Sequence, residues 1–198
     1  MNKLNNFLPT TKEEMKQRGW DELDVVLITG DAYIDSPFMG IAVVGRILED
    51  IGLRVGIIGQ PDVNSDIDVK RLGEPKLFWG VSGGSIDSMV SNYTATKKFR
   101  NDDDYTPGGK NNKRPDRATL VYTNLIRRYF KNTAPIVLGG IEASLRRLTH
   151  YDYWSNNLRK PILFDAKADY MVYGMGEQAI IDLGLYLKEG KDVKTIAG

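Results

Sequence analysis

The chain contains no cysteine and only one histidine, His150. The lack of cysteine excludes disulfides, thiolate zinc sites, cysteine nucleophiles and an iron–sulfur cluster ligated by this chain. The single histidine excludes metal sites built from several histidines. No apolar run approaches the roughly 18 residues of a membrane span, and residues 1–9 lack the basic start and apolar core of a secretory signal. We therefore expect a cytoplasmic protein that binds no metal and does not enter a membrane.

An excess of charge of one sign is also lacking. The 27 Lys and Arg residues are balanced by 26 Asp and Glu residues, which leaves a net charge of +1. The chain as a whole is therefore not expected to bind a partner through a strong net charge. Its 198 residues suit one large domain, and a domain of this size buries about 70% of its unfolded surface and needs no disulfide or metal in order to fold.

Short apolar runs alternate with helical patterns along the chain. The runs predict strands at residues 24–29, 54–58, 77–81, 136–138 and 169–172. Helices are predicted from a capping box at Thr11 and Glu14 to Gly19, after Pro37 to Gly52, at 116–130 and at 177–188. This alternation predicts an α/β fold with a doubly wound, mostly parallel five-stranded sheet. Flavodoxin-like order is favoured over a six-stranded dinucleotide fold because only five strands can be found. A helical lead-in over residues 1–22 would precede this Rossmann-like domain at 23–198.

A long stretch at about 94–115 shows no periodicity and is too long for an ordinary connection, so it is either functional or disordered. The wider segment 97–131 holds ten Lys or Arg residues, four Asp residues and several aromatic residues. Such a segment could contact RNA phosphates, which makes a nucleic-acid-binding module the alternative function. A solvated loop beside a salt-bridged helix fits the same pattern.

Glycine turns follow four of the five predicted strands. The carboxyl ends of parallel strands meet at one edge of a sheet, where α/β proteins bind ligands. Glycine at tight turns is the structural alternative. The ligand-crevice candidates are Gly30, Asp31, Tyr33, Ser82, Gly83, Gly84, Gly139, Gly140, Glu142, Ser144, Arg146, Arg147, Gly174, Gly176 and Glu177. We expect Arg146 and Arg147 to face the crevice, a domain outside this chain or an acidic partner, with one of them held by Glu142 or Asp152, because an unpaired buried guanidinium is costly.

Two short motifs match a cofactor-binding or catalytic pattern, but the rest of the sequence favours a structural role for both. The sequence from Gly174 to Ala179 matches G-x-G-x-x-A, but no later strand can supply the acidic residue that a dinucleotide ribose needs. The sequence from Gly80 to Gly84 matches the G-x-S-x-G motif of serine hydrolases, yet the only available base, His150, precedes the last strand. We interpret the second motif as a turn and keep a Ser82 hydrolase as the third hypothesis.

Several longer motifs resemble the YgiQ-type radical SAM proteins. They are Phe7-Leu-Pro9, Gly19-Trp-Asp21, Leu27-Ile-Thr-Gly-Asp-Ala-Tyr33, Tyr105-Thr-Pro-Gly-Gly-Lys110, Arg114-Pro-Asp-Arg117, Gly139-Gly-Ile-Glu-Ala-Ser-Leu-Arg-Arg147, His150-Tyr-Asp-Tyr-Trp154 and Asp165-Ala-Lys-Ala-Asp169. The resemblance covers essentially the whole chain. It implies that this is the N-terminal portion of a longer protein, in which a radical SAM barrel follows. That barrel carries a CxxxCxxC motif, a 4Fe–4S cluster and S-adenosylmethionine.

The resemblance also implies a cobalamin-binding-type Rossmann module, because the turns at Gly139-Gly140 and Gly174–Glu177 look like its loops. The D-x-H-x-x-G motif of such modules is missing, since residues 31–35 contain no histidine. Cobalamin is therefore not expected. The resemblance implies an accessory domain that caps the barrel and helps to form a crevice for an unknown substrate, without catalytic residues of its own.

Overall fold

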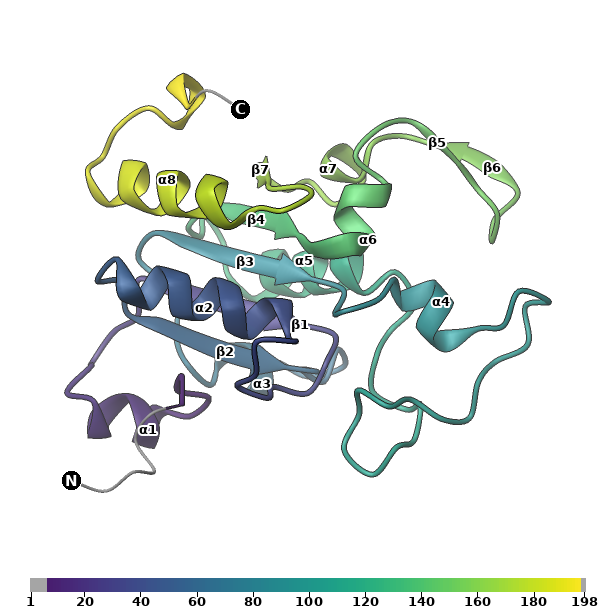
Figure 1. The fold of residues 1–198 in the computed structure, drawn as a ribbon, viewed down its shortest axis with the longest axis horizontal. Helices are drawn as coiled ribbons and strands as arrows, with labels where there is room; N and C mark the ends of the chain where they lie inside the picture. The colour runs from purple at the N-terminus through teal and green to yellow at the C-terminus, as the bar shows by residue number, and fades with distance from the viewer. Residues whose placement is uncertain (1–6, 197–198) are drawn as a thin grey trace.

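The computed structural model describes residues 7–196. The first six residues of the predicted lead-in at 1–22 and the last two of the predicted domain at 23–198 lie outside the described residues. Its centre is a five-stranded parallel sheet in the order β2-β1-β3-β4-β7 (Figure 1). The strands are β1 (Val25–Thr29), β2 (Val55–Gly59), β3 (Phe78–Ser82), β4 (Ile136–Gly139) and β7 (Tyr170–Met171). The predicted doubly wound α/β fold and its flavodoxin-like strand order are confirmed.

Helices cover both faces of this sheet. Figure 1 shows α2 (Gly40–Asp50) and α8 (Glu177–Lys188) in front of the sheet and α5 (Ala118–Tyr129) behind it. The short helix α1 (Lys12–Gln17) begins with the predicted capping box, in which Thr11 and Glu14 bond each other's backbone amides. Alternation along each strand divides the apolar side chains between these two layers.

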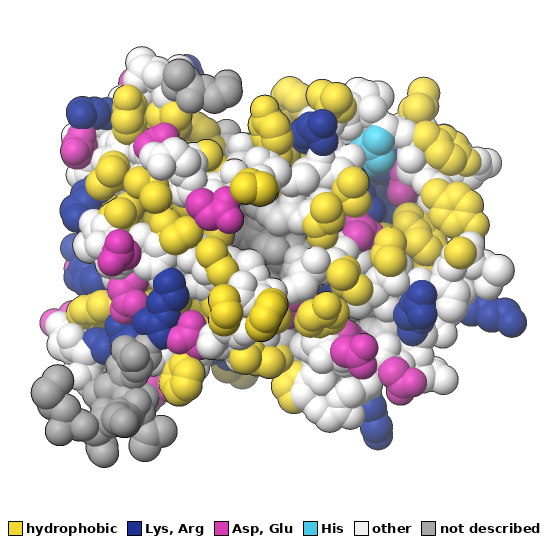
Figure 2. Space-filling model, in the orientation of Figure 1, with side chains coloured by type: hydrophobic (Ala, Val, Ile, Leu, Met, Phe, Trp, Pro, Cys, Tyr) yellow, Lys and Arg dark blue, Asp and Glu magenta, His cyan; other side chains and the backbone are white. Residues whose placement is uncertain are grey.

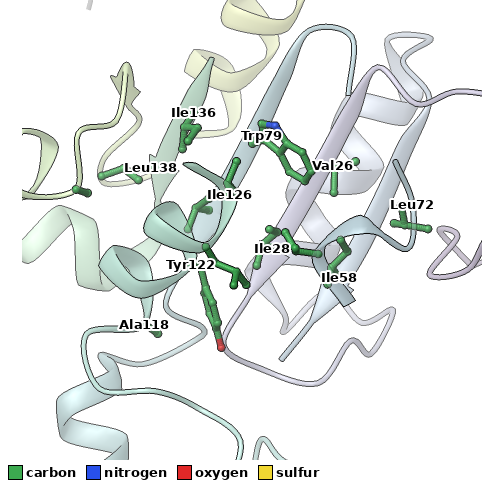
Figure 3. Close-up of a cluster of buried hydrophobic side chains, with 14 of the residues drawn as sticks. Val26, Ile28, Ile58, Leu72, Trp79, Ala118, Tyr122, Ile126, Ile136 and Leu138 are labelled. Carbon is green, nitrogen blue, oxygen red and sulfur yellow. The ribbon is translucent and has the colours of Figure 1, made fainter. Parts of the chain in front are cut away.

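Two buried clusters result, one on each face of the sheet. Behind the sheet, Tyr122 and Ile126 of α5 point toward Ile28 and Trp79 of the strands (Figure 3). In front, the core is made by Leu8, Val25, Leu27, Leu48, Leu53, Val55, Ile57, Phe78, Val137, Ile180 and Leu183. Burial of each large apolar side chain contributes about 1.5–3 kcal/mol, so both layers are firmly held to the sheet.

Several short elements were not predicted. They are α3 (Ile67–Lys70), α4 (Ser88–Asn92), α6 (Gly140–Leu145), α7 (Ile162–Asp165), the antiparallel hairpin of β5 (His150–Asp152) and β6 (Asn157–Arg159), and the 3-10 helix η2 (Val193–Thr195). Elements of three to six residues offer too little periodicity to be recognised, and their positions depend on contacts with distant segments.

The stretch at 94–115 is irregular but fixed by hydrogen bonds. Tyr105 accepts a bond from the backbone amide of Ala32 at 2.9 Å, and the side chain of Gln60 donates to Thr106 Oγ1 at 2.6 Å. At its other end, Lys97 Nζ donates to the carbonyl of Tyr153 at 3.0 Å. These bonds place the loop at the carboxyl edge of the sheet, on the side of α4 in Figure 1.

Candidate functional site

A cleft of about 430 Å³ opens at the carboxyl edge of the sheet, between the first turns of α2 and α8. At the opposite edge the two helices are in close contact, because Gly184 of α8 lies directly against Leu48 and Leu53. The helices therefore diverge toward the carboxyl edge and leave β3 visible between them (Figure 1). Figure 2 shows the same face hollowed near its middle and bordered by hydrophobic side chains.

The sequence of the central strands explains why this space is not filled. On the face toward α2 and α8, β1 and β3 begin with the apolar residues Val25 and Phe78. Alternation puts Thr29, Gly80, Ser82 and Gly139 on the same face at the carboxyl half. Small side chains at adjacent positions of three strands form a low floor. The side chains of α2 and α8 that line the cleft leave the space above this floor open.

The mouth of the cleft is formed by glycine turns. Gly84 has φ +115°, and a Cβ atom there would lie 2.2 Å from Asp31 Oδ1. Gly140 has φ +79°, and a Cβ atom there would lie 2.7 Å from Ser82 Oγ. Both positions require glycine for conformation and for space. The turns therefore bring backbone and short polar side chains together at the entrance.

Of the predicted crevice candidates, eight line this cleft. They are Asp31, Ser82, Gly84, Gly139, Gly140, Gly174, Gly176 and Glu177. Gly30 and Gly83 do not line it but lie against each other, since a Cβ on Gly30 would collide with the Gly83 carbonyl. The apolar walls were not predicted from the sequence; they are supplied by Ile41, Val43, Val44, Val172 and Ile180. Their helical and strand periodicity indicated a core face but not the divergence of the helices.

Asp31 joins the cleft to a buried ion-pair network. Its Oδ1 accepts a hydrogen bond from Arg114 Nη2 at 2.7 Å, and its Oδ2 accepts one from the Ser85 amide at 2.6 Å. Arg114 Nη2 also lies 3.4 Å from Asp103 Oδ2. Burial is the largest influence on the Asp31 carboxyl and raises its pKa above the ordinary value, although Ser85 and Arg114 act in the opposite direction. The network fixes the 94–115 loop to the end of β1.

Glu142 is fully buried, does not line the cleft, and accepts hydrogen bonds from the first turns of two helices. Its Oε2 accepts a bond from the Ser88 amide at 2.9 Å, and its Oε1 accepts one from the Thr119 amide at 3.0 Å. These amides belong to the first turns of α4 and α5, whose N–H groups have no partner within their own helix. Glu142 therefore connects three segments behind the mouth.

Arg146 and Arg147, which directly follow α6, differ in their surroundings. Arg146 is mostly buried and ion-paired with Asp87, and it also donates to the Glu142 carbonyl. Arg147 is exposed, and its guanidinium lies 5.5 Å from the centre of the Tyr173 ring. Neither lines the cleft. Asp87 thus holds Arg146, in place of the Glu142 carboxylate or Asp152.

Asp152 is paired with a different arginine. Arg117 Nη2 donates to its Oδ2 at 2.6 Å, and Ser155 donates to the same oxygen. Burial on its own would raise the pKa of the Asp152 carboxyl, but hydrogen bonds from Ser155 and Arg117 outweigh it and lower the pKa to about 2.

Ser144 and Tyr33 do not line the cleft. Ser144 Oγ donates to the Gly140 carbonyl at 2.8 Å and accepts from the Gly174 amide at 3.2 Å, so it connects two turns of the mouth. Tyr33 lines a separate hollow with Gln60, and burial raises the pKa of its hydroxyl to about 12.

The two alternative chemistries receive little support from the geometry. Ser82 Oγ accepts a bond from the Gly84 amide at 3.1 Å, whereas His150 lies in β5 and does not line the cleft. Of the basic residues in 97–131, Arg114 is buried, and Arg117 and Arg127 are ion-paired within the domain. Fewer positive charges are therefore free to meet RNA than the sequence suggested.

Residues 7–196 contain no group of three His, Asp or Glu side chains placed to hold a metal ion. Over the same residues, no helix is both long enough and apolar enough to cross a membrane.

Comparisons with known proteins agree with the resemblance found in the motifs. A family model described as Radical SAM N-terminal matches residues 7–198. A UPF0313 protein of Fusobacterium nucleatum is 63% identical over 193 residues, which are 97% of this chain and 34% of the relative. UPF0313 proteins of Thermotoga neapolitana and Pseudomonas aeruginosa are 59% and 53% identical, over 95% and 96% of this chain and 33% and 25% of their own lengths.

The chain thus spans about a third or less of the length of these relatives. No solved structure matches it. The family model covers nearly all of the sequence, and the relatives align over the same region as the model. The chain therefore belongs to the Radical SAM N-terminal family.

Proposed function

We propose that this chain is the accessory N-terminal domain of a radical SAM enzyme, and that it covers the barrel of the same polypeptide and contributes its cleft to a shared ligand crevice. The family match over residues 7–198 is the observation that carries this proposal. In the whole protein the barrel would hold a 4Fe–4S cluster and S-adenosylmethionine. A cytoplasmic location and an absence of cobalamin remain predictions.

The residues of this chain do not fit an iron–sulfur cluster. The sequence has no cysteine, and the described residues contain no cluster of alternative ligands. Cysteine thiolates are the usual ligands of such clusters, so they would have to come from another part of the polypeptide. We accordingly assign no catalytic residue to this chain.

The covering role is supported by apolar side chains around the mouth of the cleft. Phe38 and Met175 are 92% and 93% exposed, on opposite sides of the opening. Ile141, Leu145 and Tyr173 are exposed near them. Grouped exposed apolar residues are typical of surfaces that contact another domain, because leaving them in water is unfavourable. A barrel docked at this edge would bury them and close the crevice.

The experiment uses the full-length protein, reconstituted anaerobically with iron and sulfide. We expect the variant with Phe38→Ser and Met175→Ser to bind iron normally and to form 5′-deoxyadenosine at least fivefold more slowly than the wild type. Ile67→Ser is the matched control, since Ile67 is 74% exposed in α3, away from the cleft. An unchanged rate in the double variant would refute the covering role, and a wild type without a cluster would refute the radical SAM assignment.

A further inference from the structure

The side chains that line the cleft between α2 and α8 differ from those of an anion site. Among its described lining residues there is no Lys, Arg or His, and the two charged groups are the carboxylates of Asp31 and Glu177. Asp31 is ion-paired with Arg114, and Glu177 is the first residue of α8, where its negative charge complements the helix N-terminus. A phosphate or carboxylate entering this cleft would meet acids and no cationic side chain.

The walls and floor of the cleft have contrasting shapes. The walls consist mainly of branched aliphatic side chains, with Ile41 and Val44 on α2 and Ile180 on α8. The floor is low because Gly139 leaves strand backbone uncovered there, while the Leu27 side chain lies over Gly80. A low floor between two apolar walls is a slot, and a slot is filled best by a flat, apolar body. The volume of about 430 Å³ is within the range of small-molecule sites, roughly 300–1,000 Å³.

Two of the three hydroxyl groups that line the cleft, those of Thr29 and Ser82, belong to its strands, and the third, Ser85, follows β3. Thr29 Oγ1 accepts a bond from the Asp31 amide at 3.3 Å, and Ser82 Oγ accepts one from the Gly84 amide at 3.1 Å. Among the described residues, Thr29 Oγ1 donates no hydrogen bond, and Ser82 Oγ donates one long bond of 3.5 Å to the Gly84 carbonyl, so both hydroxyls can turn toward a ligand. The hydroxyls would bond a ligand atom that accepts, such as a carbonyl oxygen or an unprotonated ring nitrogen.

From these observations we propose that the cleft binds a neutral, planar ring system that carries a hydrogen-bond acceptor on its inner edge. The inference rests on the proposed function in treating this cleft as a ligand site, and it adds the chemical class of the ligand. The apolar rings would lie between α2 and α8, and the acceptor would face Thr29 and Ser82. Exposed Phe38 at the rim would cover the outer part of the rings.

The probe is prodan, a neutral naphthalene with a ketone group, whose emission shifts to the blue in an apolar site. We expect the full-length protein to bind it saturably, with one site per chain. A matched pair of competitors then tests charge: 2-acetylnaphthalene should displace prodan at a concentration at least tenfold lower than 2-naphthoate does. Equal displacement by the anion, or a signal that does not saturate, would overturn the proposal.

Two variants test the location. Gly139 has extended backbone, and the nearest atom to a Cβ there is the Val172 carbonyl oxygen at 3.8 Å, so Gly139→Val would occupy the slot without backbone strain. We expect it to weaken prodan binding at least tenfold, and we expect Ser82→Ala to weaken it about threefold to tenfold. Phe164→Ser, at an exposed apolar residue of α7, is the control and should leave affinity unchanged.

Thermal unfolding of each variant separates a filled cleft from a damaged fold. Prodan affinity that is unchanged in Gly139→Val, with a melting temperature near that of the wild type, would contradict the site. Failure of the wild type to bind prodan would also contradict it. Neither result affects the covering role, which depends on 5′-deoxyadenosine formation by the Phe38 and Met175 variant.

Discussion

Replacing Arg114 by methionine should destabilise the domain strongly. The side chains of Arg114, Asp31 and Asp103 are 0%, 2% and 1% exposed, so this ion-pair network is removed from water. Arg114 also donates from Nε to the Gly30 carbonyl at 3.1 Å. Methionine would fill most of the space but would leave two buried carboxylates without a cation.

The structure sets the expected size of this effect. Removing one partner of a buried ion pair costs about 3–5 kcal/mol, because the remaining charge has neither water nor a counter-ion. For a domain of this length, each kcal/mol lowers the melting temperature by about 2–4 °C, so Arg114→Met should lower it by about 6–20 °C. Trypsin should also cut the 94–115 loop faster, since the loop would lose its buried ion pair with Asp31 at the end of β1.

Calorimetry or circular dichroism measures the melting temperature against a matched control. Lys70→Met breaks an exposed pair, in which Lys70 and Asp66 are 45% and 44% exposed, and should change stability by less than about 1 kcal/mol. Adding Asp31→Asn to Arg114→Met should recover part of the loss, because one of the two unpaired charges is removed. A shift for Arg114→Met as small as that of the control would refute the reasoning.

Three further predictions concern single residues around the site. Above the unfolded-state pKa, near 4, the Asp152 carboxylate should stabilise the fold by about 2 kcal/mol relative to Asp152→Asn, and denaturant titrations should show this difference shrinking as the pH falls from about 4 to 2. Glu142→Gln should cost about 1–3 kcal/mol in the same titration. The glutamine side chain has one acceptor oxygen, so it can accept a hydrogen bond from only one of the Ser88 and Thr119 amides. Gly84→Ala should lower the melting temperature by more than Gly108→Ala, since both have positive φ but only Gly84 lies against the Asp31 carboxylate; equal effects would contradict the close packing.

Elements with strong local signals could be predicted from the sequence. Buried parallel strands carry continuous apolar runs, so residues such as 24–29 and 54–58 stand out without knowledge of their neighbours. The helices α2, α5 and α8 have long apolar faces bounded by glycine or proline. The flavodoxin-like order was favoured because only five strands could be found, and it is confirmed by the structure.

Features that depend on distant residues could not be predicted in this way. Arg114 lies 83 positions from Asp31, and Glu142 supports the amides of Ser88 and Thr119. The spacing of these residues in the sequence does not indicate that they are hydrogen-bond partners. The glycine turns were visible as candidates, but the cleft itself also depends on the divergence of α2 from α8.

The central claim is that the rest of the polypeptide covers the carboxyl edge of this domain. Hydroxyl-radical footprinting of the full-length protein tests it without any substitution. Phe38 and Met175 are 92% and 93% exposed here, and Ile67 and Phe164 are 74% and 68% exposed away from the cleft. We predict that Phe38 and Met175 are protected several-fold below the rates expected for exposed side chains, while Ile67 and Phe164 react at such rates. Full reactivity of Phe38 and Met175 would contradict the account.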